Sequence, residues 1–288
     1  MTLQLVAAIG PCIVACFLFL AVQAALPREK TALARAAETI AFIVGAIVGM
    51  IAILGVPSFP ARDAAQWLFY VGVAIALLIA AEPRWSKNAP LRVGVRTAAT
   101  GLALVAVLRP LIVNTWSTST TALWLAMLLL LMVAIVESYT TLAERETSAI
   151  VTGLSLLIIV AGSVVMLFAG SAKLAQLGGA VASALGGIAI LGAFRKQRYP
   201  VAGALAVAWA LTALIWVQGY IFAEAPITAM LPLIGAAFAP WVLRMQLLVR
   251  KSAWQRATVA AVVTVIPLGI AIAIAYRAYT ASASGYSY

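Results

Sequence analysis

The chain contains no histidine and only two cysteines among its 288 residues. Without histidine it lacks the usual haem ligand, the commonest zinc ligand and the commonest general base of enzymes. Cys12 and Cys16 lie one helical turn apart in an apolar segment, where their Cβ atoms are too far apart for an unstrained disulfide. We interpret both as small packing residues, and we expect no metal and no cofactor.

Charged residues are equally scarce, at 9% of the chain, and only 8 of them are acidic against 19 that are basic. The sequence has no Gly-x-Ser-x-Gly motif, no P-loop, no metal-binding histidine pair and no Cys-x-x-Cys motif. We therefore expect no catalytic residues and a protein that is not an enzyme. An enzyme that works with Glu, Arg and Tyr alone stays open, although no motif points to one.

Apolar segments fill almost the whole chain: 65% of the residues are hydrophobic, and the mean hydropathy is +1.10. A helix needs roughly 20 mostly apolar residues to cross the hydrocarbon core of a bilayer, which is about 30 Å thick. The sequence therefore predicts an all-α, polytopic integral membrane bundle in which residues 1–288 form a single transmembrane domain. About 10 transmembrane helices are expected, at 3–26, 39–57, 64–82, 98–115, 119–139, 149–170, 174–193, 201–222, 227–249 and 257–275.

Basic residues are distributed unevenly between the two sides that these spans define. Fifteen fall on one side and only four on the other, namely Arg62, Arg109, Lys173 and Arg277. Because short cytoplasmic loops carry the excess of Lys and Arg, both termini are predicted to be non-cytoplasmic. The alanine-rich chain suggests a bacterial inner membrane. The net charge of +11 then indicates anionic lipid head groups on the cytoplasmic side, and no nucleic acid, as the partner of the basic loops.

Two halves, 1–142 and 143–280, would each contain five spans, and 281–288 would form a loose tail. An odd number of spans per half is the arrangement of inverted-repeat transporters. Two short sequence similarities between the halves support a 5+5 repeat: Glu82-Pro83 resembles Glu224-Ala225-Pro226, and Val107-Leu108-Arg109 resembles Val242-Leu243-Arg244. Their offsets are unequal, and chance matches are common in such apolar sequence, so both interpretations stay open.

Small residues recur at helical spacing in two of the predicted spans. Gly45 and Gly49 form a GxxxG pair, a pattern that lets the backbones of two helices approach closely. The span 174–193 has two such faces, made by Gly178, Ala182 and Gly186 and by Ala175, Gly179, Ser183 and Gly187. This span is therefore predicted to lie inside the bundle. A hinge in a moving transporter would use the same residues, and packing is the simpler interpretation.

Ionisable residues inside membrane spans are costly and are therefore functional candidates. Five of them lie within about two turns of the predicted cytoplasmic boundary and are interpreted as solvated interfacial groups: Glu38, Glu82, Glu137, Arg244 and Arg256. Arg109 is different, because it lies 11 residues after Ala98, about 16 Å along the helix. Pro110 follows it and is expected to bend that helix.

Asn114, Gln218 and Glu224 are expected at the same outer depth as Arg109. Together the four side chains predict a polar, outward-facing vestibule that binds an anionic group, with Arg109 at its floor. The alternative is that Arg109 extends to the outer surface or pairs with Glu224 to hold two helices together.

Two functions fit these features. The first is a permease-like carrier of a small solute, for which an anionic group is the favoured chemistry. The second is a non-catalytic subunit, scaffold or assembly factor of a larger membrane complex, with protein partners. Size, span number and the faint repeat favour the carrier, whereas the scarcity of deep polar residues favours the subunit.

Overall fold

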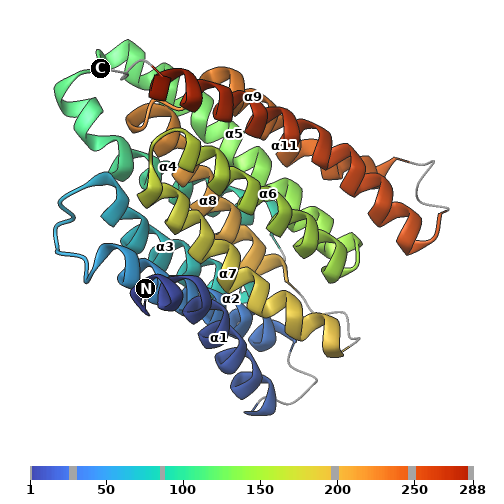
Figure 1. Cartoon of the computed structure of the whole chain (residues 1–288). Helices are drawn as coiled ribbons and strands as arrows, with labels where there is room; N and C mark the ends of the chain where they lie inside the picture. The colour runs from blue at the N-terminus through green and yellow to red at the C-terminus, as the bar shows by residue number, and fades with distance from the viewer. Residues whose placement is uncertain (1, 26–30, 85–87, 196–200, 246–250, 285–288) are drawn as a thin grey trace.

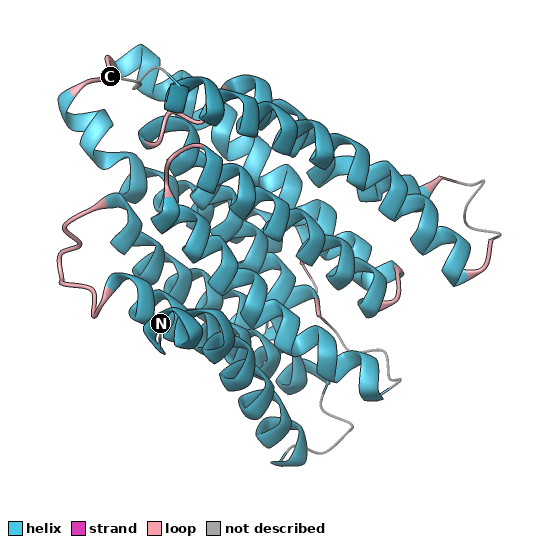
Figure 2. Ribbon diagram, viewed as in Figure 1, coloured by secondary structure: helices cyan, strands magenta, loops and turns pink. Residues whose placement is uncertain are grey.

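A computed structural model of the chain describes residues 2–25, 31–84, 88–195, 201–245 and 251–284, and every regular element in these ranges is a helix (Figure 2). This confirms the predicted all-α fold. The elements are α1 (Thr2–Ala25), α2 (Thr31–Leu54), α3 (Ala64–Ala81), α4 (Ala89–Asn114), α5 (Thr118–Arg145), α6 (Ser148–Phe168), α7 (Ala172–Arg195), α8 (Ala202–Phe222), α9 (Ile227–Phe238) and α11 (Ala253–Ser284), with the short 3₁₀ helices η1 (Glu82–Arg84) and η2 (Ala239–Arg244).

Nine of the described segments are long and apolar enough to cross a membrane, with α9 and η2 counted as one. The remaining predicted span corresponds to α1, whose described apolar stretch, Ile9–Ala21, is shorter. Such a set of helices is characteristic of a multi-pass integral membrane protein in a lipid bilayer.

Successive long helices run in opposite directions, so α1 begins and α11 ends at the same end of the bundle (Figure 1). We call this the terminal end. The opposite end, where α5 turns into α6 at Glu146-Thr147, is called the basic end. The turns at the terminal end lie between α2 and α3, α4 and α5, α6 and α7, and α8 and α9. This alternation supports the predicted order of the spans, while the inverted repeat stays a prediction.

Helix α8 is the centre of the bundle. All its residues from Gly203 to Gly219 are buried, and it packs against α2, α3, α5 and α7. Alanine and glycine recur along α8, and such small residues let neighbouring helices approach closely inside a membrane, which fits this central position. Helix α7 packs against α1, α2, α6 and α8, so the helix lies inside the bundle as predicted. Of its two faces of small residues, Gly178 and Gly187 approach neighbouring helices closely, whereas a Cβ at Gly179 would meet open space.

Predicted boundaries of five helices need correction. Helix α2 begins at Thr31 and not at residue 39, and α5 ends at Arg145 and not at residue 139. Helix α4 begins at Ala89 and not at residue 98, because the Asn88 side chain caps it and Pro90 fits its first turn. The helix predicted at 227–249 stops at Phe238 and continues as η2, since Pro240 has no N–H to continue the α-helical pattern. Helix α11 continues to Ser284, past the predicted end at 275, and residues 285–288 of the expected tail lie outside the described ranges.

Candidate functional site

Charged side chains gather inside the bundle near its basic end. We call this set the charged layer, and its members come from four neighbouring elements: Glu38 (α2), Glu82 (η1), Arg96 (α4), and Glu137 with Thr140 (α5). Glu38 and Arg96 each lie seven residues into their helices, which is about 10 Å from the basic end at 1.5 Å per residue.

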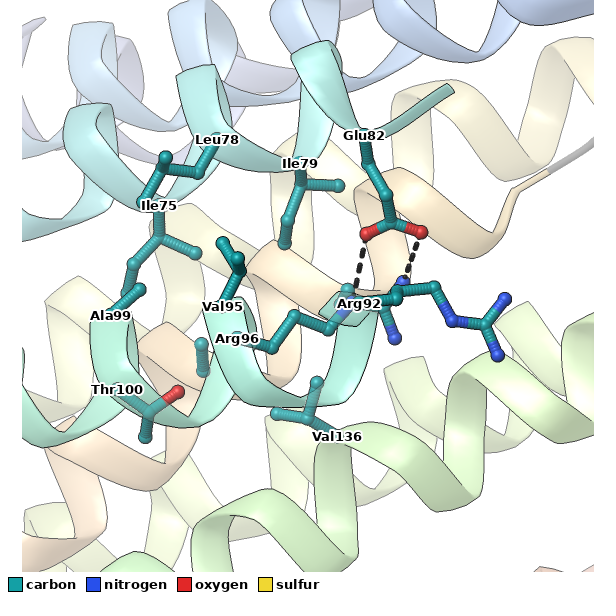
Figure 3. A pocket seen from close by; sticks show the side chains of 12 residues that line it. Ile75, Leu78, Ile79, Glu82, Arg92, Val95, Arg96, Ala99, Thr100 and Val136 are labelled. Atoms are coloured by element: carbon teal, nitrogen blue, oxygen red, sulfur yellow. Dashed lines mark hydrogen bonds and ion pairs between the residues drawn. The ribbon is translucent and has the colours of Figure 1, made fainter. Parts of the chain in front are cut away.

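Arg96 is the centre of the charged layer. Its Nε donates to Oε2 of Glu82 and its Nη2 to Oε1 of the same carboxylate, both at 2.8 Å (Figure 3). Its Nη1 donates to Glu137 Oε1 at 2.8 Å and to Thr140 Oγ1 at 3.3 Å. The guanidinium therefore joins the end of α3 to α4 and α5, and the fork-to-fork contact with Glu82 fixes its orientation.

This arrangement corrects the interpretation of Glu82 and Glu137 as solvated interfacial groups. Only 9% of the Arg96 side chain is exposed, with 14% for Glu82 and 21% for Glu137. Two carboxylates against one guanidinium leave the triad with one excess negative charge. A buried ion group is on balance no more stabilising than apolar residues of the same volume. Its presence here is therefore more informative about function than about stability.

Two small cavities lie on either side of the Arg96–Glu82 pair, each of about 20 Å³, roughly the space of one water molecule. The first is lined by Thr100 of α4 (Figure 3) and, among others, by Ala206 and Ala210 of α8. The second is lined by Arg35 and Thr39 of α2, Glu144 of α5 and Gly203 of α8, among others. Polar groups in the charged layer therefore have room for single water molecules and for nothing larger.

Glu38 is the most deeply buried of the acidic residues that the structure describes, at 1% exposure, and neither carboxylate oxygen has a hydrogen-bond partner. It faces the first turn of α8, where the backbone N–H of Ala204 is near without completing a hydrogen bond. Gly203 permits this approach, because a Cβ there would overlap the Thr39 hydroxyl. The prediction that Glu38 is solvated at the interface is therefore wrong: the contact between α2 and α8 covers it.

At the terminal end, Arg109 and Asn114 line an open groove of about 270 Å³ between the start of α3 and the end of α4. Arg62, Asp63 and Trp67 supply the opposite wall. We call it the rim groove. The Asn114 side-chain amide donates to the Pro110 carbonyl at 2.9 Å.

Arg109 lies on the outer face of α4, on the same exposed stripe as Leu102, Val105 and Val113. It is therefore at the periphery of the bundle and not near its axis. The predicted vestibule corresponds in the structure to this peripheral groove.

The other two predicted site residues lie elsewhere. Gln218 is buried at 2% exposure near the end of α8, and its Nε2 has no hydrogen-bond partner. Glu224 is exposed in the turn after α8, with a φ of 53°. Neither lines the rim groove, and no ion pair joins Glu224 to Arg109, both of which the structure describes. The structure brings Arg109 and Asn114 together, and the binding role of all four residues stays a prediction.

Asp63 forms the one ion pair in the wall of the rim groove. Its Oδ2 accepts a hydrogen bond from Lys173 Nζ at 2.6 Å, and its Oδ1 caps α3 by accepting from the backbone N–H of Gln66. Partial burial raises the pKa of Asp63, but the Lys173 hydrogen bond and charge and the backbone donors outweigh it and hold the pKa below its usual value. The charge of the Asp63 carboxylate is thus already paired with Lys173, while Arg62 and Arg109 keep the groove positive.

Further polar groups are buried beside the charged layer. The ring of Tyr139 stacks on Trp209 with centroids 4.1 Å apart, and Trp209 Nε1 donates to Ser155 Oγ at 3.1 Å. The hydroxyls of Tyr139 and Thr152 are buried without a hydrogen-bond partner. The interior therefore offers more hydrogen-bonding capacity than the sequence alone indicates.

The role of Arg96 was missed because the predicted span began two residues after it. A signal was present, since Arg96, Thr100, Ala103, Leu104 and Val107 have the spacing of one helical face, and all five are buried. Asn88 and Pro90 also mark an earlier helix start. Extending the span to residue 89 would have placed Arg96 inside the bundle.

Comparison with family models, with curated proteins and with solved structures finds no match to this chain. Among the residues that the structure describes, no three His, Cys, Asp or Glu side chains are grouped so that they could hold a metal ion. The function has to be inferred from the arrangement of the chain's own charged groups.

Proposed function

We propose that the protein is a permease-like carrier of a small anionic solute. The observation that carries this proposal is Arg96, buried between Glu82 and Glu137 inside an otherwise apolar bundle. Ionisable residues in the interior of membrane proteins are expensive, and they most often mark ion or solute pathways. A purely structural interface would be at least as stable with apolar residues there.

The rim groove and the charged layer would act in sequence in such a carrier. Arg62 and Arg109 attract an anion to the terminal end, and Asn114 adds a hydrogen-bonding amide beside them. At the opposite end, the ion pairs of Arg96 close the bundle. An anion that reaches the charged layer competes with Glu82 and Glu137 for the Arg96 guanidinium. Binding of the solute can therefore break these ion pairs and open the layer.

We also propose that the membrane is a bacterial inner membrane and that both termini are non-cytoplasmic. The unequal distribution of basic residues supports this orientation, because it places the basic end in the cytoplasm. Anionic lipid head groups would then neutralise the basic loops on that side.

A non-catalytic subunit, scaffold or assembly factor of a larger membrane complex is the second candidate. The observation that favours it is the small size of the two cavities at the charged layer, about 20 Å³ each. A scaffold needs no interior space, whereas a carrier has to open before a solute can pass.

Thermal unfolding of the protein purified in mild detergent tests the carrier. Inorganic phosphate, sulfate, acetate and succinate serve as probes. We expect at least one of them to raise the unfolding midpoint by about 5 °C at roughly 100 times its dissociation constant. Arg109→Gln should remove this shift. Arg277→Gln is the matched control, since Arg277 is also exposed at the terminal end but lies outside the rim groove.

An equal shift in both variants would remove Arg109 from the binding site. The absence of a shift with all four probes, together with stoichiometric partner proteins in the purified sample, would replace the carrier by the subunit.

A further inference from the structure

Glu38 differs from every other acidic residue that the structure describes. Seven of the eight acidic residues in the sequence lie in the described ranges. Five of the seven are in ion pairs, namely Asp63, Glu82, Glu137, Glu144 and Glu146. Glu224 is exposed to the surroundings. Glu38 alone is buried with neither a cationic partner nor a hydrogen bond to its carboxylate oxygens.

Among the described residues, no cation on the elements packed against α2 forms an ion pair with Glu38. These elements are α1, α3 with η1, α7 and α8. Helix α8 has no charged residue, and the titratable groups in the described part of α1 are Cys12 and Cys16. Arg96 is engaged by Glu82 and Glu137, and Arg35, one turn before Glu38, is exposed. The remaining ionisable residues at this end of the packed elements are Glu82 and Arg84 in η1 and Arg195 at the end of α7.

An ionised carboxylate cannot persist in this position. The cost of removing it from water exceeds the favourable effects of the α8 N-terminus and of the charge on Arg35, which is itself exposed. A protonated carboxyl has no net charge and is far less costly to bury. A metal ion is a poor alternative occupant, since no cluster of acidic, cysteine or histidine ligands surrounds the site in the described part of the chain.

The proposed route for the proton leads toward the basic end through the second cavity. Arg35 and Thr39, three residues before and one residue after Glu38, line this cavity together with Glu82 and Glu144, while Glu38 itself is not among its lining residues. That cavity has room for about one water molecule, and Arg35 reaches the exterior. The same cavity touches Arg96, which places the ion pairs of the charged layer on the proposed route.

We propose that Glu38 is a proton-binding site, protonated while the charged layer is closed, that releases its proton to the basic end when the layer opens. Once ionised, Glu38 competes with Glu82 and Glu137 for Arg96 and stabilises the open arrangement. In the proposed carrier the proton would be the coupling ion. That coupling rests on the carrier function, whereas the proton site does not.

Infrared spectroscopy of the purified protein tests the site without any solute. At pH 7 we expect the C=O stretching band of one protonated carboxylic acid, shifted in D₂O, and its loss in Glu38→Gln. Glutamine has the shape of the protonated acid, so this variant should fold. Glu224→Gln removes an exposed carboxyl and should leave the band in place. Absence of the band from the wild-type protein, or its survival in Glu38→Gln, would overturn the proposal.

A measurement on the unaltered protein gives an independent check. Dicyclohexylcarbodiimide modifies protonated carboxyls in apolar surroundings, so mass spectrometry should find the adduct on Glu38 and not on the ion-paired Glu137. An unmodified Glu38 would contradict the proposal.

The coupling has its own readout. The thermal shift produced by sulfate or acetate, whose charge is constant in this range, should vary between pH 6 and pH 9 in the wild-type protein and become independent of pH in Glu38→Gln. A shift with the same pH dependence in both proteins would leave the proton site intact and remove its link to transport. A wild-type protein that shows the infrared band but no anion shift would overturn the carrier alone.

Discussion

Replacing Arg96 by methionine should lower the free energy of unfolding by about 3–5 kcal/mol, because it leaves two buried carboxylates without their partner. Arg96→Met keeps most of the side-chain volume, so the loss reports the charge and not a cavity. Denaturant or thermal unfolding in detergent micelles measures it. Arg92→Met is the matched control: Arg92 lies one turn earlier, is 25% exposed and contacts Glu144 at 3.5 Å. Removing that pair should cost less than about 1 kcal/mol.

Removing the two carboxylates as well should compensate for the loss of Arg96. Combining Arg96→Met with Glu82→Gln and Glu137→Gln removes the whole ion group, and most of the lost stability should return. The carrier proposal further expects this triple variant to lose the thermal shift caused by the anion probe. If Arg96→Met destabilised the protein no more than Arg92→Met does, the buried triad would be wrong.

Gly45→Leu should destabilise the packing of α1 on α2 by about 1–3 kcal/mol or more. A Cβ at Gly45 would lie 2.7 Å from the carbonyl oxygen of Pro11 and 2.9 Å from the Cβ of Ala15. The nearest atom belongs to the backbone, so a change of side-chain rotamer cannot relieve the overlap and α1 has to move. Unfolding measurements and the reactivity of Cys16, whose thiol donates to the Gly187 carbonyl at 3.1 Å, report that movement.

Gly94→Leu is the matched control for this change. Gly94 is an exposed residue of α4 with no atom within 4 Å of its Cβ position, so we expect an effect within about 0.5 kcal/mol. Equal effects of the two substitutions, or an unreactive Cys16 in Gly45→Leu, would contradict the close approach of α1 and α2.

The helices and their close contacts could be predicted because both depend on local patterns. Apolar runs of the required length mark the spans, and small residues at every fourth position mark the faces that meet, as Gly45 with Ala15 and Gly187 with the Cys12 carbonyl demonstrate. A span boundary depends on capping, which is why recognising Asn88 and Pro90 as a helix start would have corrected α4.

The charged layer could not be predicted in the same way, because it depends on which helices become neighbours. Arg96 pairs with Glu137, 41 residues further along the chain, and no local pattern links the two. Depth along a helix also says nothing about the direction in which a residue faces. Glu38 and Arg109 illustrate this in opposite senses: the first faces α8 in the core, and the second faces outward.

If the charged layer is a closure that opens, a thiol placed beside it becomes accessible when its ion pairs are removed. Ala206 is fully buried and lines the first cavity with Glu82 and Arg96, while Ala237 is an equally buried alanine of α9. Ala206→Cys and, as control, Ala237→Cys are made in a Cys12→Ala/Cys16→Ala background and exposed to a membrane-impermeant thiol reagent in inside-out vesicles.

With the ion pairs intact, both cysteines should resist labelling. When Glu82→Gln and Glu137→Gln are introduced as well, the cysteine at 206 should react in inside-out vesicles, while the cysteine at 237 should not. In intact cells, where the reagent reaches only the opposite side of the membrane, the cysteine at 206 should stay unlabelled. If in inside-out vesicles it stayed as protected as the cysteine at 237, the layer would be a rigid scaffold and the carrier would be excluded.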